Sequence, residues 1–167
     1  MRRLWNMTSR RIGSSLVVVF LTLVGLAAPA AADQVPFTLH GSGVVMGVTH
    51  LPGGLTQVDF STSGTATHLG NYTGPVTRIE DHQGNFTNIA VSIGANGTDS
   101  VFFAVSGHSE DTHGSCVIIS TGTYTVTGGT GAFANATGSG TFTAQHDPCA
   151  GTGGATYEGT ISRPNSG

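Results

Sequence analysis

The stretch Tyr124-Thr-Val-Thr-Gly-Gly-Thr-Gly-Ala-Phe-Ala-Asn-Ala-Thr-Gly-Ser-Gly-Thr-Phe142 contains the clearest indication of the fold. Its first residues alternate large apolar side chains with threonine, which predicts a strand. The strand is expected to break at residues 128–131, where three glycines permit positive φ and a sharp turn, and a second strand resumes at Ala136. Phe133 stands as one large apolar residue among small ones, so we expect it to plug one end of a β-structure.

The same stretch also matches the pattern G-x-G-x-x-A of dinucleotide-binding loops, at residues 129–134. That function requires a helix that begins at the third small residue, followed by further βαβ units. Residues 135–141 are mostly poor helix formers, and the chain that remains is too short for a doubly wound sheet. A turn between two strands is therefore the favoured interpretation.

The first 32 residues resemble a cleavable signal peptide. A basic segment with four arginines precedes an apolar run at residues 16–26, and small residues then offer a cleavage site just before Asp33. The apolar run is shorter than the ~20 residues that a membrane-spanning helix needs, so stable membrane insertion is not expected. Arg10-Arg11 leaves twin-arginine export open as an alternative to ordinary secretion.

Residues 33–167 are long enough for one domain with its own core. They contain two arginines, no lysine and nine carboxylates, which leaves a net charge of −7. Such a surface repels phosphate backbones and anionic lipids, so nucleic-acid and membrane-surface partners are not expected.

Cys116 and Cys149 are the only cysteines, and an even count in an exported chain predicts a disulfide. The alternative is a pair of metal-binding or catalytic thiols, which the absence of C-x-x-C spacing disfavours. With a disulfide, the predicted location is outside the cell or in the cell envelope.

Nearly every later segment is predicted to be a strand, and no segment shows a helical stripe of useful length. Residues 81–85 and Asn96-Gly97 are expected to form hairpin turns, and residues 107–114 and 146–154 polar loops. The predicted strands are residues 37–48, 55–67, 69–79, 86–93, 98–106, 115–127, 136–145 and 155–162.

Eight short antiparallel strands with glycine-rich turns predict an all-β domain, either a closed barrel or a two-sheet sandwich. The barrel is favoured because many glycines fall inside strands, where they permit tight coiling, and because closure removes exposed strand edges. An immunoglobulin-like sandwich is less consistent with residues 33–167, which lack the usual core tryptophan.

The segment from Val126 to Gly138, with Gly-Gly-Thr-Gly followed by Phe133, resembles a motif of dirigent proteins and allene oxide cyclases. Residues 64–73, which include Thr-His-Leu-Gly, are similar to a stretch of exported bacterial proteins described as allene-oxide-cyclase-like barrels. The resemblance implies an eight-stranded calycin-type barrel with an apolar interior, and a homotrimer as in the plant families. It assigns no catalytic residue to this chain.

Three residues are expected to contact a ligand in the barrel interior: His68, Tyr72 and Phe133. His68 lies where the second predicted strand passes into the third, so it can bind a ligand oxygen or act as an acid or base. The structural alternative is that its side chain hydrogen-bonds a nearby carbonyl and holds the turn.

Residues 108–113 hold two histidines and two carboxylates, and His146 with Asp147 follows later. Without a helix to fix their geometry these groups are interpreted as a solvated loop, and no metal or other cofactor is predicted. The remaining histidines, His40, His50 and His82, are interpreted as residues of the surface or of the barrel rim. Alternation along their strands predicts that Asp59 and Glu158 point outward.

No nucleophile elbow or acid–base constellation is visible, so the catalytic residues stay unknown. The leading hypothesis is an exported barrel that binds a small apolar or amphipathic molecule in its interior without covalent chemistry. The resemblance supports one alternative, a cofactor-free cyclase or isomerase that steers ring closure of a reactive substrate. A structural secreted module is the second alternative.

Overall fold

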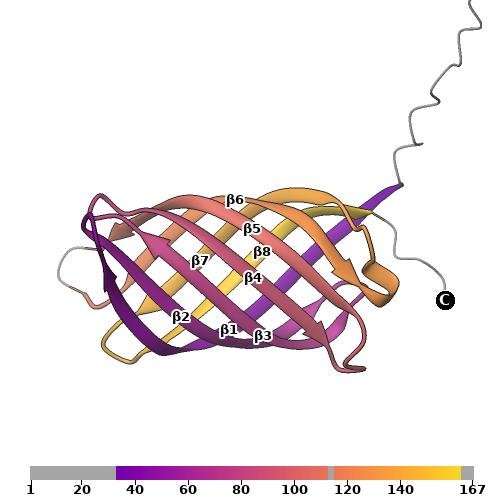
Figure 1. The fold of residues 1–167 in the computed structure, drawn as a ribbon, viewed down its shortest axis with the longest axis horizontal. Coiled ribbons are helices and arrows are strands. Elements are labelled where there is room, and N and C mark those ends of the chain that lie inside the picture. The colour runs from indigo at the N-terminus through magenta and orange to yellow at the C-terminus, as the bar shows by residue number, and fades with distance from the viewer. Residues whose placement is uncertain (1–32, 113–114, 163–167) are drawn as a thin grey trace, which may run out of the picture. The chain divides into compact units, whose positions relative to one another are not determined.

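A computed structural model describes residues 33–112 and 115–162. In this part of the chain eight antiparallel strands close into one barrel, and β8 completes it by pairing with β1 (Figure 1). The strands are β1 Gln34–Leu51, β2 Leu55–Ala66, β3 Gly70–Glu80, β4 Asn85–Gly94, β5 Ser100–Asp111, β6 Ile118–Thr130, β7 Gly138–Asp147 and β8 Thr152–Ser162, with a short 3₁₀ helix, η1 Gly131–Phe133. The predicted closed barrel is confirmed, and the sandwich is excluded.

The expected signal peptide, residues 1–32, lies outside the described residues. His113 and Gly114 of the expected loop at residues 107–114, and residues 163–167, also lie outside them.

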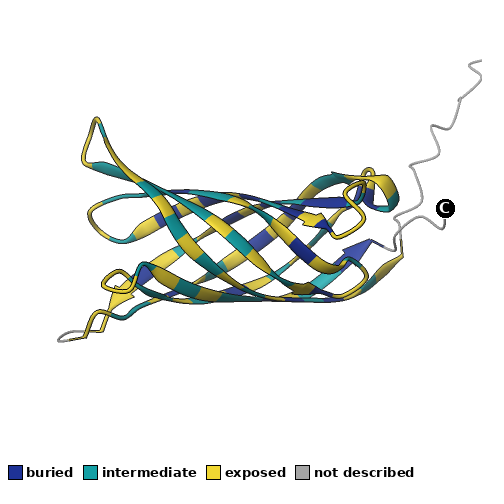
Figure 2. Cartoon of the chain, turned by 90° about the horizontal axis from the view of Figure 1, so that it is seen from below, coloured by how far each residue is buried: buried dark blue, intermediate teal, exposed yellow. Residues whose placement is uncertain are grey.

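Alternation of side chains gives the barrel its two faces (Figure 2). Strand β4 shows this most regularly, with Phe86, Asn88, Ala90 and Ser92 buried and the residues between them more exposed. Because successive side chains of a strand point to opposite faces, one row fills the barrel and the other meets solvent.

Glycine makes room for an aromatic ring where strands β6, β7 and β8 meet. A Cβ atom at Gly140 would lie 2.7 Å from Cε1 of Tyr124, and one at Gly159 would lie 2.8 Å from the Tyr124 hydroxyl oxygen. Both distances are shorter than van der Waals contact. The interior position of Tyr124 therefore depends on glycine at both neighbours.

The two ends of the barrel differ. We call the end with the β2–β3, β4–β5 and β6–β7 connections the plugged end; it lies on the right in Figure 1. Phe133 on η1 is 1% exposed there and belongs to the same core as Phe37, Val101 and Ile161. The expectation that Phe133 closes one end agrees with this position.

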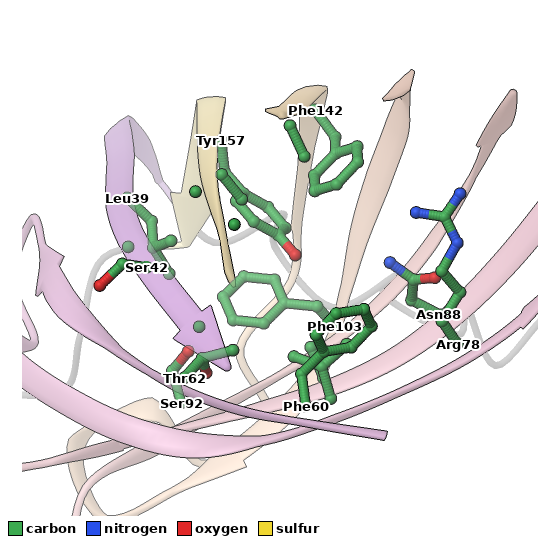
Figure 3. A pocket seen from close by; sticks show the side chains of 18 of the residues that line it. Leu39, Ser42, Phe60, Thr62, Arg78, Asn88, Ser92, Phe103, Phe142 and Tyr157 are labelled. Carbon is green, nitrogen blue, oxygen red and sulfur yellow. The ribbon is translucent and has the colours of Figure 1, made fainter. Parts of the chain in front are cut away.

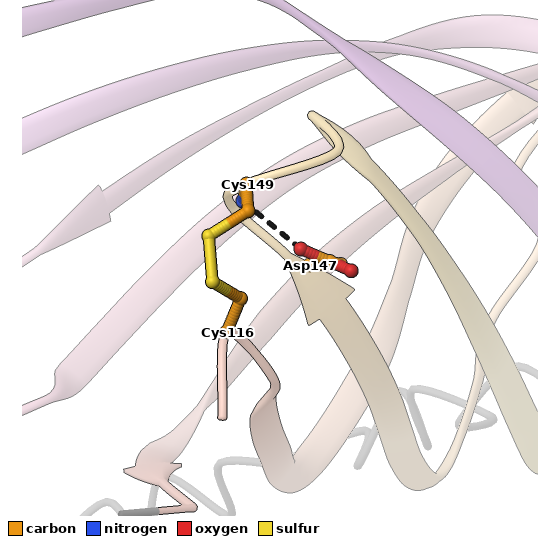
Figure 4. A group of neighbouring side chains, drawn as sticks. All are labelled: Cys116, Asp147 and Cys149. Atoms are coloured by element: carbon orange, nitrogen blue, oxygen red, sulfur yellow. Dashed lines mark hydrogen bonds between the residues drawn. A yellow bond between two sulfur atoms is a disulfide. The ribbon is translucent and has the colours of Figure 1, made fainter. Parts of the chain in front are cut away.

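The opposite end, which we call the disulfide end, carries the predicted Cys116–Cys149 bond (Figure 4). The bond joins the β5–β6 connection to the β7–β8 connection, and Asp147 Oδ1 accepts hydrogen bonds from the backbone N–H groups of Cys149 and Ala150 at 2.9 and 3.0 Å. The two cysteines are 33 residues apart. Closing a loop of this size stabilises the fold by about 3–4 kcal/mol in the chain-entropy account.

Strand β6 does not break at residues 128–131 as expected but continues to Thr130. The register shifts between Phe102 and Phe103, where a bulge on β6 absorbs one extra residue, and Gly128 adopts φ +142°. A bulge lets the chain bend without ending the ladder. After η1 the chain enters strand β7 and not a helix, so the dinucleotide-loop interpretation has no structural support.

Several predicted boundaries were wrong because polar or glycine-rich residues continue the ladders. Strand β5 extends to Asp111 through the expected loop at residues 107–114, with Gly107 directly opposite Gly122. Strands β7 and β8 together take most of the expected loop at residues 146–154. Backbone pairing does not require apolar side chains, so composition alone mislocated these ends.

The hairpin predicted at Asn96-Gly97 is present, but its connection is longer than these two residues and is not a type I′ turn. The connection spans residues 95–99, and Asn96 Oδ1 accepts hydrogen bonds from the backbone of Thr98 and Asp99 at 3.1 and 3.0 Å. Gly97 alone of the pair has positive φ, at +72°. Asparagine here acts through its side chain, as in an Asx-turn.

Replacing the plug should cost much more stability than replacing an equally apolar surface residue. We expect Phe133→Ala to lower the free energy of unfolding by about 3–5 kcal/mol, because a buried aromatic ring leaves a cavity. Ile89→Ala is the control, since Ile89 is 71% exposed, and it should change stability by no more than about 0.5 kcal/mol. Denaturant unfolding followed by circular dichroism measures both, and equal effects would contradict the plug.

Candidate functional site

The interior contains a cavity of about 90 Å³ between the middle of the barrel and the disulfide end (Figure 3). Its lining is mainly apolar, with Leu39, Phe60, Val76, Phe103 and Phe142 among the contributing side chains. The plugged half of the barrel is filled by contrast, because Phe133 and its neighbours pack there.

The cavity exists because one wall has almost no side chains. Gly41 and Gly43 on β1 pair with Ala155 and Gly153 on β8, and Ala144 on β7 lies beside them. Five neighbouring positions of the lining thus carry at most a methyl group. Larger side chains line the cavity from β2 and β3, among them Phe60 and Val76. The Tyr72 hydroxyl from β3 lies against Gly41, in the place that a Cβ atom there would take.

Aromatic rings form the boundary toward the filled half. Tyr157 contacts Phe103 and Phe142, with ring centroids 5.4 and 5.0 Å apart, in tilted and edge-on arrangements. Such pairs add about 0.5–1.5 kcal/mol to the area they bury and hold the rings in defined positions. The boundary of the cavity is therefore preorganised.

The side chain of Arg78 carries a charge inside the barrel. Arg78 on β3 is 7% exposed, its guanidinium stacks 3.8 Å from the centre of the Phe86 ring, and its Nη2 lies 2.8 Å from Glu80 Oε2. The guanidinium also donates hydrogen bonds to the hydroxyls of Ser109 and Ser120, strands β5 and β6. A single side chain thereby connects three strands across the interior.

Three side chains of the lining retain a buried polar atom without a hydrogen-bond partner among the described residues. These atoms are Arg78 Nε, Asn88 Oδ1 and His146 Nε2. An unsatisfied buried polar atom costs about 1–3 kcal/mol, so three such atoms on one cavity are expensive to maintain. A molecule that supplies hydrogen bonds at this place would recover part of that free energy.

Burial changes the acid–base properties of the lining. Desolvation raises the pKa of Tyr72 to about 12. Desolvation also raises the pKa of Tyr157, and the neighbouring tyrosines contribute to that shift. Desolvation, and secondarily the charge of Arg78, lowers the pKa of His146, while Asp147 opposes the shift. At neutral pH the phenols and the imidazole are therefore uncharged, and Arg78 with Glu80 supplies the charge.

The structure separates the three residues expected to contact a ligand. Tyr72 is buried and lines the cavity, with its hydroxyl next to Gly41. Phe133 is buried at the plugged end, away from the cavity lining. His68 is exposed in the β2–β3 turn with φ +67°. The Thr67 backbone N–H donates a hydrogen bond to the Thr38 carbonyl oxygen, and the Thr67 hydroxyl oxygen accepts one from the Thr38 N–H, so Thr67 holds this turn.

The histidines and carboxylates of residues 108–113 do not converge where the structure describes them. His108, Glu110 and Asp111 are exposed on β5, while Ser109 between them faces inward. Within the described residues, the metal-type cluster is Cys116, Asp147 and Cys149, and its two sulfurs are bonded to each other. A disulfide leaves no thiolate to bind a metal.

The two strand carboxylates point outward, as predicted. Glu158 is exposed on β8. Asp59 lies on the outer face of β2, where Gln57 and Thr77 donate hydrogen bonds at 2.9 and 2.7 Å that lower its pKa. Neither can serve as an acid or base inside the barrel. His40, His50 and His82 are exposed, in agreement with their interpretation as surface residues.

Sequence reasoning did not single out Arg78 and Asn88, and it wrongly interpreted His146 as part of a solvated loop, whereas all three line the cavity. The side chains of Arg78 and Tyr72 point to the same, inward face of β3, because the two residues are separated by an even number of positions along the strand. That periodicity is the signal that could have placed Arg78 inside. The assumption that a charged residue faces solvent concealed it.

No protein-family model matches the sequence, and no curated protein matches it. Among solved structures the chain is similar to the pterocarpan synthase dirigent protein GePTS1, with 16% sequence identity and a TM-score of 0.46 over 95% of this chain and 100% of that chain. A dirigent protein is thus a structural neighbour. So distant a likeness supports no conclusion about activity, and the relation to allene oxide cyclases and exported bacterial proteins stays a prediction.

The pKa of His146 tests the electrostatics of the cavity. We expect an NMR titration to place it below the ordinary value of about 6.5, and Arg78→Gln to raise it part of the way back, because burial is the larger cause. Since the unfolded chain binds a proton more readily than native His146, this residue destabilises the fold as pH falls below about 6.5. An unchanged pKa in Arg78→Gln would show that the two groups do not interact.

Proposed function

We propose that the protein binds a small amphipathic molecule inside the barrel by non-covalent contacts. The observation that carries the proposal is the cavity whose apolar lining includes three side chains with unpartnered buried polar atoms. An apolar body fits the aromatic and aliphatic walls, and one polar group fits the region of Arg78 and Asn88.

The energetics support an occupied interior. A barrel selected only for stability would fill this space, since cavities and unsatisfied polar atoms each lower the free energy of unfolding. Glycine and alanine on β1, β7 and β8 maintain the space. A purely structural module gains nothing from this arrangement, so the ligand-binding function is favoured over it.

The size of the cavity limits the ligand. A volume of about 90 Å³ is smaller than the roughly 150 Å³ apolar cavity that accepts benzene in another protein. A short or slender group is therefore enclosed, and the rest of a longer molecule must extend toward the disulfide end. Linear chains meet this requirement better than fused rings.

A second candidate function, the steering of ring closure or isomerisation, has one specific observation in its favour. His146 lies on the cavity with a neutral imidazole, and Tyr72 and Tyr157 line the same space. An uncharged imidazole can accept a proton from a bound substrate. Loss of turnover in His146→Gln with ligand affinity retained would distinguish this function from binding alone.

We also propose that the protein works outside the cytosol. A disulfide is typical of an oxidising environment outside the cytosol, and the basic and apolar segments of residues 1–32 support export. Among the described residues, no helix has the length and apolarity to cross a bilayer.

Blocking the cavity should abolish binding. The test uses the full chain produced in an exporting host, with linear alcohols from butanol to octanol as probes and calorimetry as the readout. Ala144→Phe places a ring in the cavity from β7, and we expect it to weaken binding at least tenfold. Thr143→Phe adds the same ring to the exposed outer face one residue away and should leave affinity unchanged.

Equal affinity of the two variants would show that the alcohols bind elsewhere. The proposed function would be refuted for linear amphipathic ligands if calorimetry detects no heat of binding with any of the alcohols. This conclusion requires that the circular dichroism spectrum of the wild-type protein shows it to be folded.

A further inference from the structure

The charges of this protein are divided in an unusual way between its surface and its interior. All nine carboxylates of the chain lie among the described residues, where Arg78 is the one lysine or arginine. That one cation is 7% exposed and lies inside the barrel. Within the described residues, the arginine charge that a ligand can meet therefore lies in the cavity lining, while the carboxylates make the surroundings negative.

The positive charge is already neutralised. Glu80 Oε2 lies 2.8 Å from Arg78 Nη2, and the side chain of Glu80 is 27% exposed. Nη1 and Nη2 also donate to Ser120 and Ser109, so Nε is the donor that has no partner. An anionic ligand would have to compete with Glu80 for the guanidinium, and would bring a second negative charge beside it.

The polar groups that remain match a hydroxyl. Arg78 and Asn88 are directly opposite each other on β3 and β4, and Asn88 is 6% exposed with an unpartnered Oδ1 (Figure 3). The amide both donates and accepts, and Nε donates. A hydroxyl can pair with both groups because it also donates and accepts, whereas a carboxylate accepts only and an ammonium group donates only.

We propose that the Arg78–Glu80 pair makes the barrel selective for neutral, hydroxyl-bearing amphipathic molecules, and that Glu80 is the residue that excludes carboxylates. This inference rests on the proposed function, since it concerns the ligand of the same cavity. The inference gives Glu80 a role in specificity. Glu80 can take this role because it is the last residue of β3, on the side of the barrel that carries the disulfide.

The electrostatic reasoning predicts how the preference can be reversed. Removing the charge of Glu80 leaves a buried guanidinium without its counter-ion, and a buried charge strongly favours an ionised partner. A ligand carboxylate could then take the place of Glu80 and form charge-assisted hydrogen bonds, which are about twice as strong as neutral ones. The same substitution does little for an alcohol.

The test compares three ligands of equal length: 1-hexanol, hexanoate and hexylammonium. Calorimetry at neutral pH on the full chain with its disulfide intact should give wild-type affinity for hexanol at least tenfold above that for either ion. Glu80→Gln should bind hexanoate at least tenfold more tightly than wild type does. The double variant Arg78→Gln/Glu80→Gln should lose this gain, because no guanidinium remains.

Glu158→Gln is the matched control. It removes one carboxylate from the outer face of β8 and changes the net charge by the same amount. An equal gain in hexanoate binding by Glu158→Gln and Glu80→Gln would overturn the inference, since overall charge would then explain the effect.

The outcomes separate the two proposals. Wild-type protein that binds hexanoate as well as hexanol overturns the selectivity and leaves the ligand-binding function intact. Failure of all three probes refutes the proposed function, and the inference falls with it. If Glu80→Gln does not fold, the wild-type ratio of hexanol to hexanoate affinity still decides the question.

Discussion

The pairing of β8 with β1 is the interaction on which the rest of the structure depends. Residues Gln34–Val44 pair with Thr152–Ser162 in an unbroken antiparallel register. This pairing turns an open sheet into a barrel, so that every inward side chain faces other inward side chains across a closed interior. It also removes the two strand edges that would otherwise be exposed. Without closure neither the core nor the cavity would exist.

Closure makes the distribution of side-chain volume along the barrel decisive. Aromatic and branched residues near Phe133 fill the plugged half, whereas glycine and alanine on β1, β7 and β8 leave the other half partly empty. The disulfide connects two loops at that emptier end, where packing contributes least. The filled half supports the fold, and the other half contains the cavity to which we assign the proposed ligand-binding function.

Polar chemistry follows the same division. Arg78 reaches Ser109 and Ser120 across the barrel, and Asn88 and His146 lie on the same cavity. Buried polar groups are retained only where other interactions compensate for their desolvation. At three atoms of the cavity lining the compensation is incomplete, and the proposed ligand-binding function rests on this observation. The Tyr124 hydroxyl, outside the lining, is a fourth buried atom without a partner among the described residues.

Patterns in the sequence predicted the closed all-β architecture, the disulfide, the position of Phe133 at one end of the barrel and the outward direction of Asp59 and Glu158. These features follow from local alternation, turn residues and cysteine count, which act over a few residues or follow from composition. The same patterns did not predict where the ladders end. Residues 107–111 are polar yet paired, because backbone hydrogen bonds extend β5 regardless of side chains.

Which inward residues line the same cavity depends on the closed fold and not on local patterns. Tyr72 and Arg78 point to the same face of β3, but only the closure of the barrel brings them together with Ala144 and His146 from β7. The tertiary structure also places His68 in a turn outside the cavity lining. The physical reason is that a cavity is a property of opposing walls. Its shape depends on side chains more than fifty residues apart, such as Arg78 and His146, whose proximity no local pattern records.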